Sequence, residues 1–523
     1  MMMGLVSVVL GGLLVLLFHF SNLLFEKPRL IRAKLRRQGI NGPCPHFFLG
    51  NIPEIKSIRR QLQSSLKETS QEKDSSISHR WPSSLFPHME KWREQYGSIC
   101  LYSTGSIHWL LVTDIEMVKE VSLCTSLNLG KPSYLFKSYG PLFGQGILSS
   151  SGPIWAHQRK IIAPELYLHK VKGMVNVIVD STNIMLRSWE TRLESEGGTV
   201  SDMKIDEDLR SLSADIIARA CFGSNYTEGK EIFTKLRDLQ KVISKITAGI
   251  PGFRYLPFKI NKDMWRLEKE INSTISKLVK RRLEAAREKD LLQMILEGAN
   301  SYEGSDGLAS NPISNEKFII DNCKNIFFAG HETTAITASW CLMLLAAHQD
   351  WQDRARAEVF EVCGNGPPDA SVLGNMKTLT MVIQETLRLY PPAVFVIRTA
   401  LKDIIFKDLQ IPEGMNIQIP IHVLQQDPHL WGPDAHKFKP ERFANGILGS
   451  CKAPQAYIPF GVGARVCVGQ QLAQTELKVI LSLILMKFHF SLSSSYLHSP
   501  SFGLVIEPGY ETGFILMKKG FML

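Results

Sequence analysis

Apolar positions recur at helical spacing along most of the chain. Side chains three and four residues apart share one face of an α-helix, so an apolar stripe at that spacing predicts an amphipathic helix. The pattern is clear over residues 213–223, over 264–299 and in a long run over 315–348. Two runs of β-forming residues on either side of Gly105 instead predict a hairpin over 96–114. The chain is therefore predicted to be mainly α with small β-sheets.

Two polar stretches, 63–78 and 300–311, interrupt the apolar pattern and are predicted to be loops. No repeat of solenoid length is present, and the composition does not change after the first fifty residues. The apolar fraction of 44% and the charged fraction of 21% are ordinary for a protein with a large core. We therefore expect one large domain over 53–523.

The first 25 residues, MMMGLVSVVLGGLLVLLFHFSNLLF, are apolar and carry no formal charge. About 20 apolar residues are enough for a helix to span a bilayer. Six Lys and Arg residues follow between positions 27 and 37, whereas a cleaved signal peptide carries its basic residues before a shorter apolar run. A buried core helix is the other alternative. We expect a transmembrane signal-anchor over 1–25, then a basic juxtamembrane segment and proline-rich hinge over 26–52.

Charge and cysteine content narrow the possible partners. Much of the net charge of +10 is explained by the juxtamembrane cluster, which anionic lipid would attract. Positive flanks stay on the cytoplasmic side of a membrane, so the domain is predicted to face the cytosol. Nucleic acid is not an expected partner, because no basic patch interleaved with aromatic residues is evident. The nine cysteines are odd in number, scattered and without a CxxC pair, which argues against a disulfide framework and a zinc site.

The long helix predicted over 315–348 contains the segment FFAGHETTA near its middle. Ser314 can cap its start, and at the α-helical rise the helix would be about 50 Å long. Glu332 and Thr333 place an acid and a hydroxyl in apolar surroundings, where a buried carboxylate without a use is costly. The alternative is a helix kink in which threonines bond back to the preceding turn. HExxH zinc chemistry is excluded, because Ala335 stands where the second histidine would be.

Three shorter motifs are weak when taken singly. In QETLRLYPP, Glu385 and Arg388 are three apart on one helix face, a spacing typical of a solvated ion pair that contributes about 0.2–0.5 kcal/mol. The segment FKPERF places Arg442 after a proline turn, and WAHQR places Trp155 and Arg159 four apart on one face. Each of these motifs alone has a structural explanation.

The segment AYIPFGVGARVCVGQ, residues 456–470, surrounds one cysteine with three glycines and one arginine. Glycines weaken helices and strands, so three close together indicate that the backbone approaches another group closely. A strong apolar helix is predicted to begin at Cys467, and a helix N-terminus stabilises a thiolate. Such a thiolate would suit an iron ion, with Arg465 as a cation for an anionic cofactor group. The alternative is a buried apolar cysteine in a glycine turn.

This glycine loop resembles the haem-binding signature of the cytochrome P-450 family, the haem-thiolate monooxygenases. The residues that match the signature are Phe460, Gly461, Gly463, Arg465, Cys467 and Gly469. The other motifs stand in the order of the family: the proline-rich hinge, WAHQR, AGHETT, Glu385 with Arg388, Arg442 and finally the cysteine loop. Six ordered motifs over essentially the whole chain make the resemblance specific. It implies the P-450 fold, a single large domain behind an N-terminal transmembrane helix.

The resemblance implies a role for each motif. Cys467 would be the axial ligand of haem b and would favour cleavage of the O–O bond. Glu332 and Thr333 would deliver protons to bound dioxygen, for which Ala329 and Gly330 would leave room. The haem-propionate partners would be Trp155, Arg159, Arg398 and Arg465. Other cofactor contacts in the loop would come from Phe460, Gly461 and Gly469. A buried structural triad would be formed by Glu385, Arg388 and Arg442.

The resemblance also implies partners and a location. O2 would be the co-substrate, and NADPH would act indirectly through a cytochrome reductase, because the chain has no flavin- or dinucleotide-binding glycine motif. The lipid bilayer would hold the chain as a single-pass protein of the endoplasmic reticulum with its catalytic domain in the cytosol. The sequons at Asn225 and Asn272 would then stay unglycosylated.

The segments around Glu385, Arg442 and Cys467 resemble those of plant members of the clan that includes gibberellin oxidases. This implies a lipophilic substrate, with a gibberellin-type diterpenoid acid expected to be hydroxylated or epoxidised and a triterpenoid acid as the nearest alternative. The substrate-facing positions would be Phe136, Phe143, Phe328, 393–396 and 502–505. A haem-thiolate isomerase or lyase stays open as a second function, although Glu332 and Thr333 argue against it. A membrane-tethered haem or lipid binder without turnover is a third.

Overall fold

The computed structural model describes residues 11, 12, 15, 26–69, 77–195, 197–198, 200–223, 226–246, 253–284, 290–303, 314–509 and 512–518. Within these residues the chain is mainly helical and has four small sheets, as the apolar pattern predicts. The helix at the centre is α15 (Asn315–Ala347), and its bounds agree with the predicted run over 315–348 to within one residue. The Ser314 side chain caps it by accepting a hydrogen bond from the Lys317 N–H.

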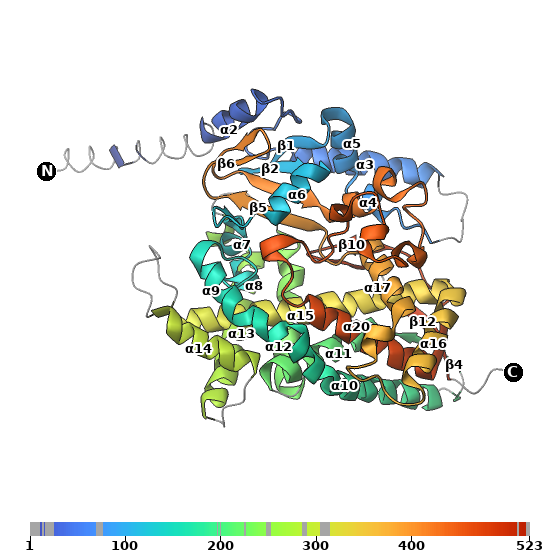
Figure 1. Ribbon diagram of the computed structural model, residues 1–523. Helices are drawn as coiled ribbons and strands as arrows, with labels where there is room; N and C mark the ends of the chain where they lie inside the picture. The colour runs from blue at the N-terminus through green and yellow to red at the C-terminus, as the bar shows by residue number, and fades with distance from the viewer. Residues whose placement is uncertain are drawn as a thin grey trace.

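Other helices surround α15 on several sides, which buries nearly all of its side chains. Figure 1 shows α10, α11, α12 and α13 on one side of α15 and the largest sheet on the other. The helices of the first half of the chain are α2 (Lys27–Arg36), α3 (Ile52–Thr69), α4 (Trp81–Leu85), α5 (Pro87–Tyr96), α6 (Ile115–Leu123), α7 (Tyr134–Lys137), α8 (Gly140–Phe143), α9 (Gly152–Ile162), α10 (Leu168–Ser195), α11 (Asp206–Phe222) and α12 (Tyr226–Ile243). Those of the second half are α13 (Lys259–Glu284), α14 (Leu291–Glu303), α16 (Gln349–Cys363), α17 (Lys377–Leu389), α18 (Ile421–Gln425), α19 (Pro428–Trp431) and α20 (Gln470–Lys487).

The largest sheet has five strands in the order β1-β2-β8-β5-β3. Its bounds are β1 (Ile99–Thr104), β2 (Ile107–Val112), β3 (Leu129–Gly130), β5 (Phe395–Ala400) and β8 (Asn416–Pro420). The hairpin β1–β2 confirms the prediction over 96–114, and Gly105 in its turn has a φ of 57°. The smaller sheets are β4-β12-β9, β6-β7 and β10-β11, with bounds β4 (Val200–Lys204), β12 (Gly513–Lys518), β9 (Phe488–Leu492), β6 (Ile404–Phe406), β7 (Leu409–Ile411), β10 (Pro500–Phe502) and β11 (Ile506–Pro508).

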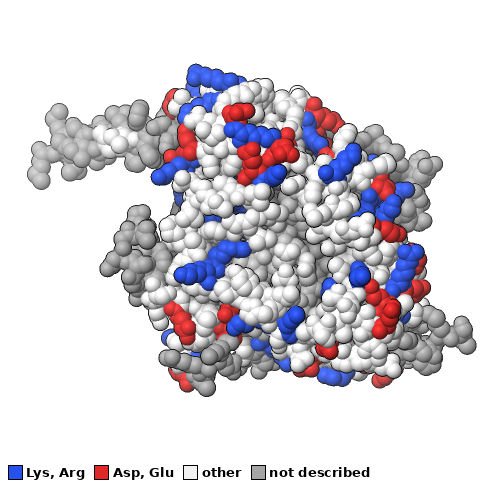
Figure 2. All heavy atoms as spheres, viewed as in Figure 1, with Lys and Arg blue, Asp and Glu red and all other residues white. Residues whose placement is uncertain are grey.

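The basic segment that begins with α2 folds onto the domain. Helix α2 buries Leu35 in an apolar cluster with the β1–β2 hairpin, and Figure 2 shows Lys and Arg side chains, together with some acidic ones, where α2 lies in Figure 1. The predicted hinge lies along β1: the Leu101 N–H donates to the Asn41 carbonyl at 2.9 Å, and a Cβ at Gly42 would clash with the Leu101 backbone. The hinge is therefore packed against the sheet.

The predicted anchor over 1–25 lies outside the described residues, apart from positions 11, 12 and 15. Among the residues that the structure describes, no helix has both the length and the hydropathy needed to cross a bilayer. All nine cysteines lie in the described part of the chain and all are free thiols, as their number and scatter predict.

The two predicted loops are partly wrong. Helix α3 extends to Thr69, so the first part of the polar stretch 63–78 is helical, and α14 continues to Glu303 into the stretch 300–311. The stretch 63–78 contains Lys, Glu and Gln residues that favour helices, and in both stretches a helix that is already nucleated continues for a few residues at little cost. Residues 70–76 and 304–313 lie outside the described part of the chain.

Candidate active site

The cysteine loop joins the short 3₁₀ helix at Gly463–Arg465 to α20. Gly461 and Gly463 have left-handed φ angles of 68° and 77°, which residues with a side chain rarely adopt. A Cβ at Gly463 would also clash with the carbonyl oxygen of Ser122 at the end of α6. The Cys467 N–H donates to the Phe460 carbonyl at 2.9 Å, which closes the loop. These two glycines therefore allow the tight turn that presents the cysteine.

Helix α20 begins at Gln470 with Gly469 as its N-cap, so the predicted helix start at Cys467 is wrong by three residues. The cysteine lies just before the helix, because the loop needs these residues to complete its turn. Burial raises the pKa of the Cys467 thiol, while the N–H groups of Gly469 and Gln470 and the Arg159 cation oppose that rise. The side chain nevertheless retains accessible surface. A sulfur with backbone donors on one side and open surface on another is suited to binding a metal.

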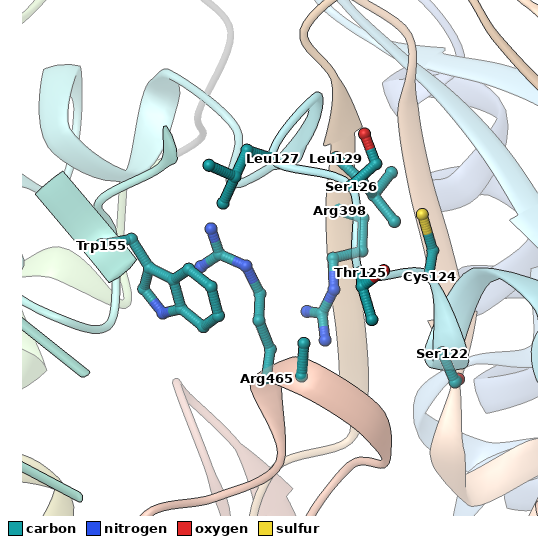
Figure 3. A pocket seen from close by; sticks show the side chains of 10 residues that line it. Ser122, Cys124, Thr125, Ser126, Leu127, Leu129, Trp155, Arg398 and Arg465 are labelled. Atoms are coloured by element: carbon teal, nitrogen blue, oxygen red, sulfur yellow. The ribbon is translucent and has the colours of Figure 1, made fainter. Parts of the chain in front are cut away.

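Four cationic side chains gather beside the loop. Figure 3 shows Arg398 from β5 and Arg465 from the cysteine loop extending into the same pocket, with Trp155 of α9 beside Arg465. The Arg465 guanidinium lies 4.0 Å from the Trp155 ring centroid, a cation–π contact. Burial, followed by Arg398 and Arg159, lowers the pKa of Arg465 to about 9. Burial, followed by Arg398 and Arg465, also lowers the pKa of Lys131 well below its usual value.

The three arginines of this group donate to backbone carbonyls rather than to carboxylates. The pairs are Arg159 Nη1 with Val466 O at 2.9 Å, Arg398 Nη1 with Ile397 O at 3.0 Å and Arg465 Nη1 with Ser150 O at 3.1 Å. Within the described chain, none of them forms an ion pair with an acidic side chain. Buried cations that repel one another are unfavourable unless an anion compensates them. The group therefore fits an anionic ligand.

In the middle of α15, a threonine hydroxyl bonds to the backbone of the preceding turn, as the alternative of a helix kink predicts. The Thr333 hydroxyl donates to the Ala329 carbonyl, one turn earlier, at 2.8 Å. A Cβ at Gly330 would meet Ile217 Cδ1 at 2.5 Å, so the glycine lets α11 approach α15 closely. Packing against Ile217 is thus sufficient to explain the glycine, and its role in leaving room for dioxygen stays a prediction.

Glu332 lies in a buried network of charges and is 1% exposed. Its Oε1 accepts a hydrogen bond from Arg210 Nε at 3.3 Å, and Arg210 Nη2 also donates to Glu507 at 3.0 Å. One guanidinium therefore joins α11, α15 and β11. Burial lowers the pKa of His331, whose ring is neutral at pH 7 although its Nε2 lies 3.3 Å from Glu332 Oε2. That oxygen has no hydrogen-bond partner within the described chain.

The structure brings Glu385, Arg388 and Arg442 together. Arg388 donates to the two carboxylate oxygens of Glu385 at 2.6 and 2.8 Å, and Arg442 Nε lies 3.5 Å from Glu385 Oε1. The alternative of a solvated surface pair is wrong, because the Glu385 and Arg388 side chains are both 0% exposed. Arg388 also donates to three backbone carbonyls, those of Gln425, Ala435 and Lys437. The bidentate ion pair lies within α17, and the three carbonyl bonds of Arg388 hold α17 to the end of α18 and to the segment that follows α19.

Comparison with known proteins identifies the family. Residues 76–509 match the model of the family described as Cytochrome P450. The chain belongs to the cytochrome P450 family. It is 51% identical over 503 residues to cytochrome P450 714C2 of Oryza sativa subsp. japonica, with 95% of each chain covered. It is 46% identical over 511 residues to cytochrome P450 714A2 of Arabidopsis thaliana, with 96% of each chain covered. It is also 45% identical over 513 residues to cytochrome P450 714B3 of Zea mays, covering 97% of this chain and 94% of the maize protein.

As a cytochrome P450, the chain is a monooxygenase that uses haem b with a thiolate ligand, O2 and electrons that a reductase supplies from NADPH. The residues present fit that cofactor. Cys467 offers an accessible sulfur supported by backbone N–H groups. In the described part of the chain, Arg159, Arg398 and Arg465 form a cationic group without a carboxylate partner, which suits the two propionates of haem b. When bound, the haem supplies the redox chemistry that activates O2.

Several residues of the P450 site are not evident from the sequence. Lys131 joins the cationic group from the segment after β3, and no local motif marks it. Arg210 and Ser213 lie on the face of α11 that meets α15, since they are three residues apart and Ile217 continues the same face. For these two residues, the sequence signal is a polar stripe on an otherwise buried helix. The stripe can be interpreted once the structure shows that it faces α15.

Glu476 of α20 is a further buried acid that the sequence motifs do not include. It is 0% exposed, and its Oε1 accepts a hydrogen bond from the Ser213 hydroxyl at 2.7 Å. The Ser213 hydroxyl also lies 3.4 Å from the Gly330 carbonyl oxygen. Burial raises the pKa of Glu476 to about 8, so the side chain is mostly neutral at pH 7. It links α20, which follows the cysteine loop, to the back of α15.

We predict that Arg388→Ala destabilises the haem-loaded protein by about 3–5 kcal/mol, because it removes one partner of a buried ion pair and leaves Glu385 without its bidentate donor. Denaturant unfolding followed by haem absorbance and circular dichroism measures the loss. Lys439→Ala is the control, since it removes an ion pair with Asp434 in which the lysine side chain is 52% exposed. Equal stability of the two variants would contradict the structural role of the triad.

We predict that Glu476→Gln weakens the pH dependence of stability. The carboxyl loses its proton near pH 4.5 when unfolded and near pH 8 when folded, so wild-type stability falls as pH rises between those values. The glutamine variant lacks this loss. The difference in unfolding temperature, variant minus wild type, should therefore increase by at least about 2 °C between pH 6 and pH 8. Glu297→Gln makes the same chemical change at an exposed position. Parallel pH curves for wild type and Glu476→Gln would exclude a raised pKa.

Proposed function

We propose that this P450 is anchored in the membrane of the endoplasmic reticulum and oxidises a gibberellin-type tetracyclic diterpenoid acid by hydroxylation or epoxidation. The catalytic part of the proposal rests on one observation: an accessible cysteine sulfur lies beside a group of arginines that form no ion pair with an acidic side chain among the described residues. The substrate part rests on the resemblance of three segments to plant members of the clan that includes gibberellin oxidases. The apolar side chains described below support it.

Each residue of the cysteine site has a proposed part in holding the cofactor. Cys467 would ligate the iron, and Phe460, Gly461 and Gly469 would contact the macrocycle from the same loop. Arg159, Arg398 and Arg465 would donate to the propionates, with Trp155 fixing Arg465 through the cation–π contact. Ala329 and Gly330 would lie along the dioxygen side of the site. Lys131 would add a fourth basic side chain to this group.

Glu332 and Thr333 are proposed to move protons toward the bound oxygen. The Glu332 carboxylate has one oxygen paired with Arg210 and one without a hydrogen bond in the described chain, so it has an acceptor available for a donor or water. Thr333 holds its hydroxyl one residue further along the helix, donating to Ala329. Rotation of that hydroxyl away from the helix carbonyl would let it donate elsewhere, which costs one weak intrahelical bond.

We predict that Glu332→Gln and Thr333→Ala retain haem but divert electrons to peroxide, because proton delivery fails while electron delivery continues. Loss of a general acid typically lowers turnover about 10²-fold or more, and peroxide released per NADPH oxidised should rise several-fold. Thr334→Ala, at the next buried threonine of α15, is the matched control and should leave coupling unchanged. Wild-type coupling in both test variants would refute the proton role.

The side chains expected over the haem form two aromatic groups. Phe143 of α8 and Phe328 of α15 pack edge to face with ring centroids 5.7 Å apart. Phe395 and Phe502 lie 6.0 Å apart and share Phe86 as a neighbour, at 5.4 and 5.2 Å. Phe86 was not among the residues expected from the sequence. Apolar groups of this kind favour a rigid hydrocarbon skeleton over a polar substrate.

We propose that residues 1–25 form the single membrane span and that the basic α2 holds the following domain on the cytosolic side. The reductase would then share the membrane and deliver electrons from the same compartment. Asn272, within α13, would face the cytosol and stay unglycosylated.

The substrate proposal is tested with the full-length protein, a plant reductase and NADPH. A gibberellin precursor should shift the haem spectrum and yield a product one oxygen heavier by mass spectrometry. A triterpenoid acid is assayed in parallel, and reactions without reductase are the control. If the triterpenoid acid binds and turns over while gibberellins do neither, the proposed substrate class is wrong and the monooxygenase activity stands.

A further inference from the structure

The inner face of α2 carries a buried guanidinium over the β1–β2 hairpin. Leu35 is fully buried and shares an apolar cluster with Leu101 and Leu110 of the hairpin. Arg32 lies nearly one turn earlier on the same face of the helix and is only 8% exposed. The arginine is therefore enclosed between the helix, the hinge and the hairpin, although a charged side chain on a short basic helix would ordinarily stay in solvent.

Among the described residues, the Arg32 guanidinium has a hydrogen-bond acceptor for one of its three nitrogens. Arg32 Nη1 donates to the Pro43 carbonyl of the hinge at 3.2 Å. Its Nε and Nη2 are buried and have no hydrogen-bond partner in the described chain. Unmade hydrogen bonds of a buried charged group cost more than those of a neutral one. These two nitrogens form the edge of arginine that binds a phosphate or carboxylate through two parallel hydrogen bonds.

His108 lies two residues before Leu110 on β2, so it faces the same side of the hairpin as Leu110, which packs in the cluster with Leu35 of α2, and its side chain is also incompletely paired. Both of its ring nitrogens are buried and without a hydrogen-bond partner among the described residues. Burial, followed by the Arg32 cation, lowers the pKa of His108 to about 4, so the ring is neutral at pH 7. A neutral imidazole has one N–H donor and one acceptor nitrogen. Arg32 Nε, Arg32 Nη2 and the protonated ring nitrogen of His108 are thus three donor atoms without an acceptor in the described chain.

No acidic side chain of the described chain compensates this cluster. The ionisable groups that act on Arg32 are Arg36, a second cation, and the Cys44 thiol. Asp403, the acid that contacts α2, pairs with Lys34 at 3.4 Å on the exposed side of the helix. The local charge is therefore positive, which favours an anion over a water molecule.

We propose that Arg32 and His108 form a binding site for a phosphate group. Arg32 would hold two phosphate oxygens through Nε and Nη2, and the His108 N–H would bind a third or share one of them. Tetrahedral phosphate supplies enough oxygens for all three donors, and no proton transfer or bond rearrangement is needed. The proposal uses the membrane anchor of the proposed function but not its substrate.

The location favours the phosphate of a lipid headgroup. Arg32 follows the proposed span over 1–25 by seven residues, about 10 Å along a helix, which matches the depth of the headgroup region. Leu35 is the one fully buried apolar residue of α2 within the described chain, so the helix can lift from the hairpin at small cost to admit a headgroup. Free inorganic phosphate could bind through the same contacts, and the experiment below distinguishes it from a lipid headgroup.

The test follows amide hydrogen exchange in α2 and the β1–β2 hairpin of the full-length, haem-loaded protein. In one arm, inorganic phosphate is titrated in a phosphate-free maltoside detergent, with chloride at equal ionic strength as the reference. In the other arm, bilayers of phosphatidylcholine are compared with bilayers of galactolipid, which has no phosphate. The variants are Arg32→Lys, which keeps the charge but loses the two-donor edge, and His108→Gln. Arg36→Gln removes an exposed charge from the same helix and is the control.

We expect phosphatidylcholine to slow exchange in the hairpin about tenfold relative to galactolipid in wild type and in Arg36→Gln. Arg32→Lys and His108→Gln should lose most of that difference while keeping a normal haem spectrum, which shows that they are folded. A response to inorganic phosphate but none to the change of lipid would support the site and assign free phosphate as its ligand. Equal exchange under all conditions in wild type, or an undiminished response in Arg32→Lys, would overturn the proposal and leave water as the partner.

Discussion

In the proposed function, a single cysteine sulfur carries negative charge inside a largely apolar domain, and much of the site can be explained by that requirement. Burial opposes the thiolate, so the chain surrounds Cys467 with N–H groups at the start of α20 and with the Arg159 cation. The donors reach the sulfur because Gly461 and Gly463 turn the backbone through left-handed conformations. The same turn brings the loop against Ser122, at the end of α6. Loop, helix and cation therefore depend on one another.

Three groups of buried charged side chains differ in the partners that compensate their charge. This difference distinguishes a structural ion pair from groups that indicate a ligand. Glu385 and Arg388 satisfy each other and the surrounding carbonyls, which is the expected pattern of a structural ion pair. Within the residues that the structure describes, the arginines beside the cysteine loop donate hydrogen bonds to carbonyls and form no ion pair, which fits a ligand that supplies negative charge. Between α11, α15 and α20, Glu332 accepts a hydrogen bond from Arg210, and burial raises the pKa of Glu476 to about 8. Buried acids in this region support the proton role proposed for Glu332.

The parts of the molecule that sequence reasoning predicts are those fixed by local pattern. The ends of α15 follow from its apolar run and from the capping Ser314, and the β1–β2 hairpin follows from β-forming runs around Gly105. Helix ends in polar segments are less predictable, because α3 and α14 continue into stretches whose composition also suits loops. The sequence predicts a start of α20 at Cys467 instead of Gln470, because the turn around Cys467 depends on contacts with α6 and not on helix propensity. Lys131 and Glu476 have no local signal, and Arg210 has only the polar stripe on α11, since the importance of all three comes from side chains that are distant in sequence.

The central claim is that Cys467 presents a thiolate to haem iron, and the absorption spectrum of the reduced protein with carbon monoxide tests it most directly. Thiolate ligation shifts the Soret band strongly to the red, whereas a histidine or water ligand does not. Wild type should show the red-shifted band, and Cys467→Ser should lose it even where haem stays bound. Retention of the red-shifted band by Cys467→Ser would show that another group ligates the iron and would contradict this account.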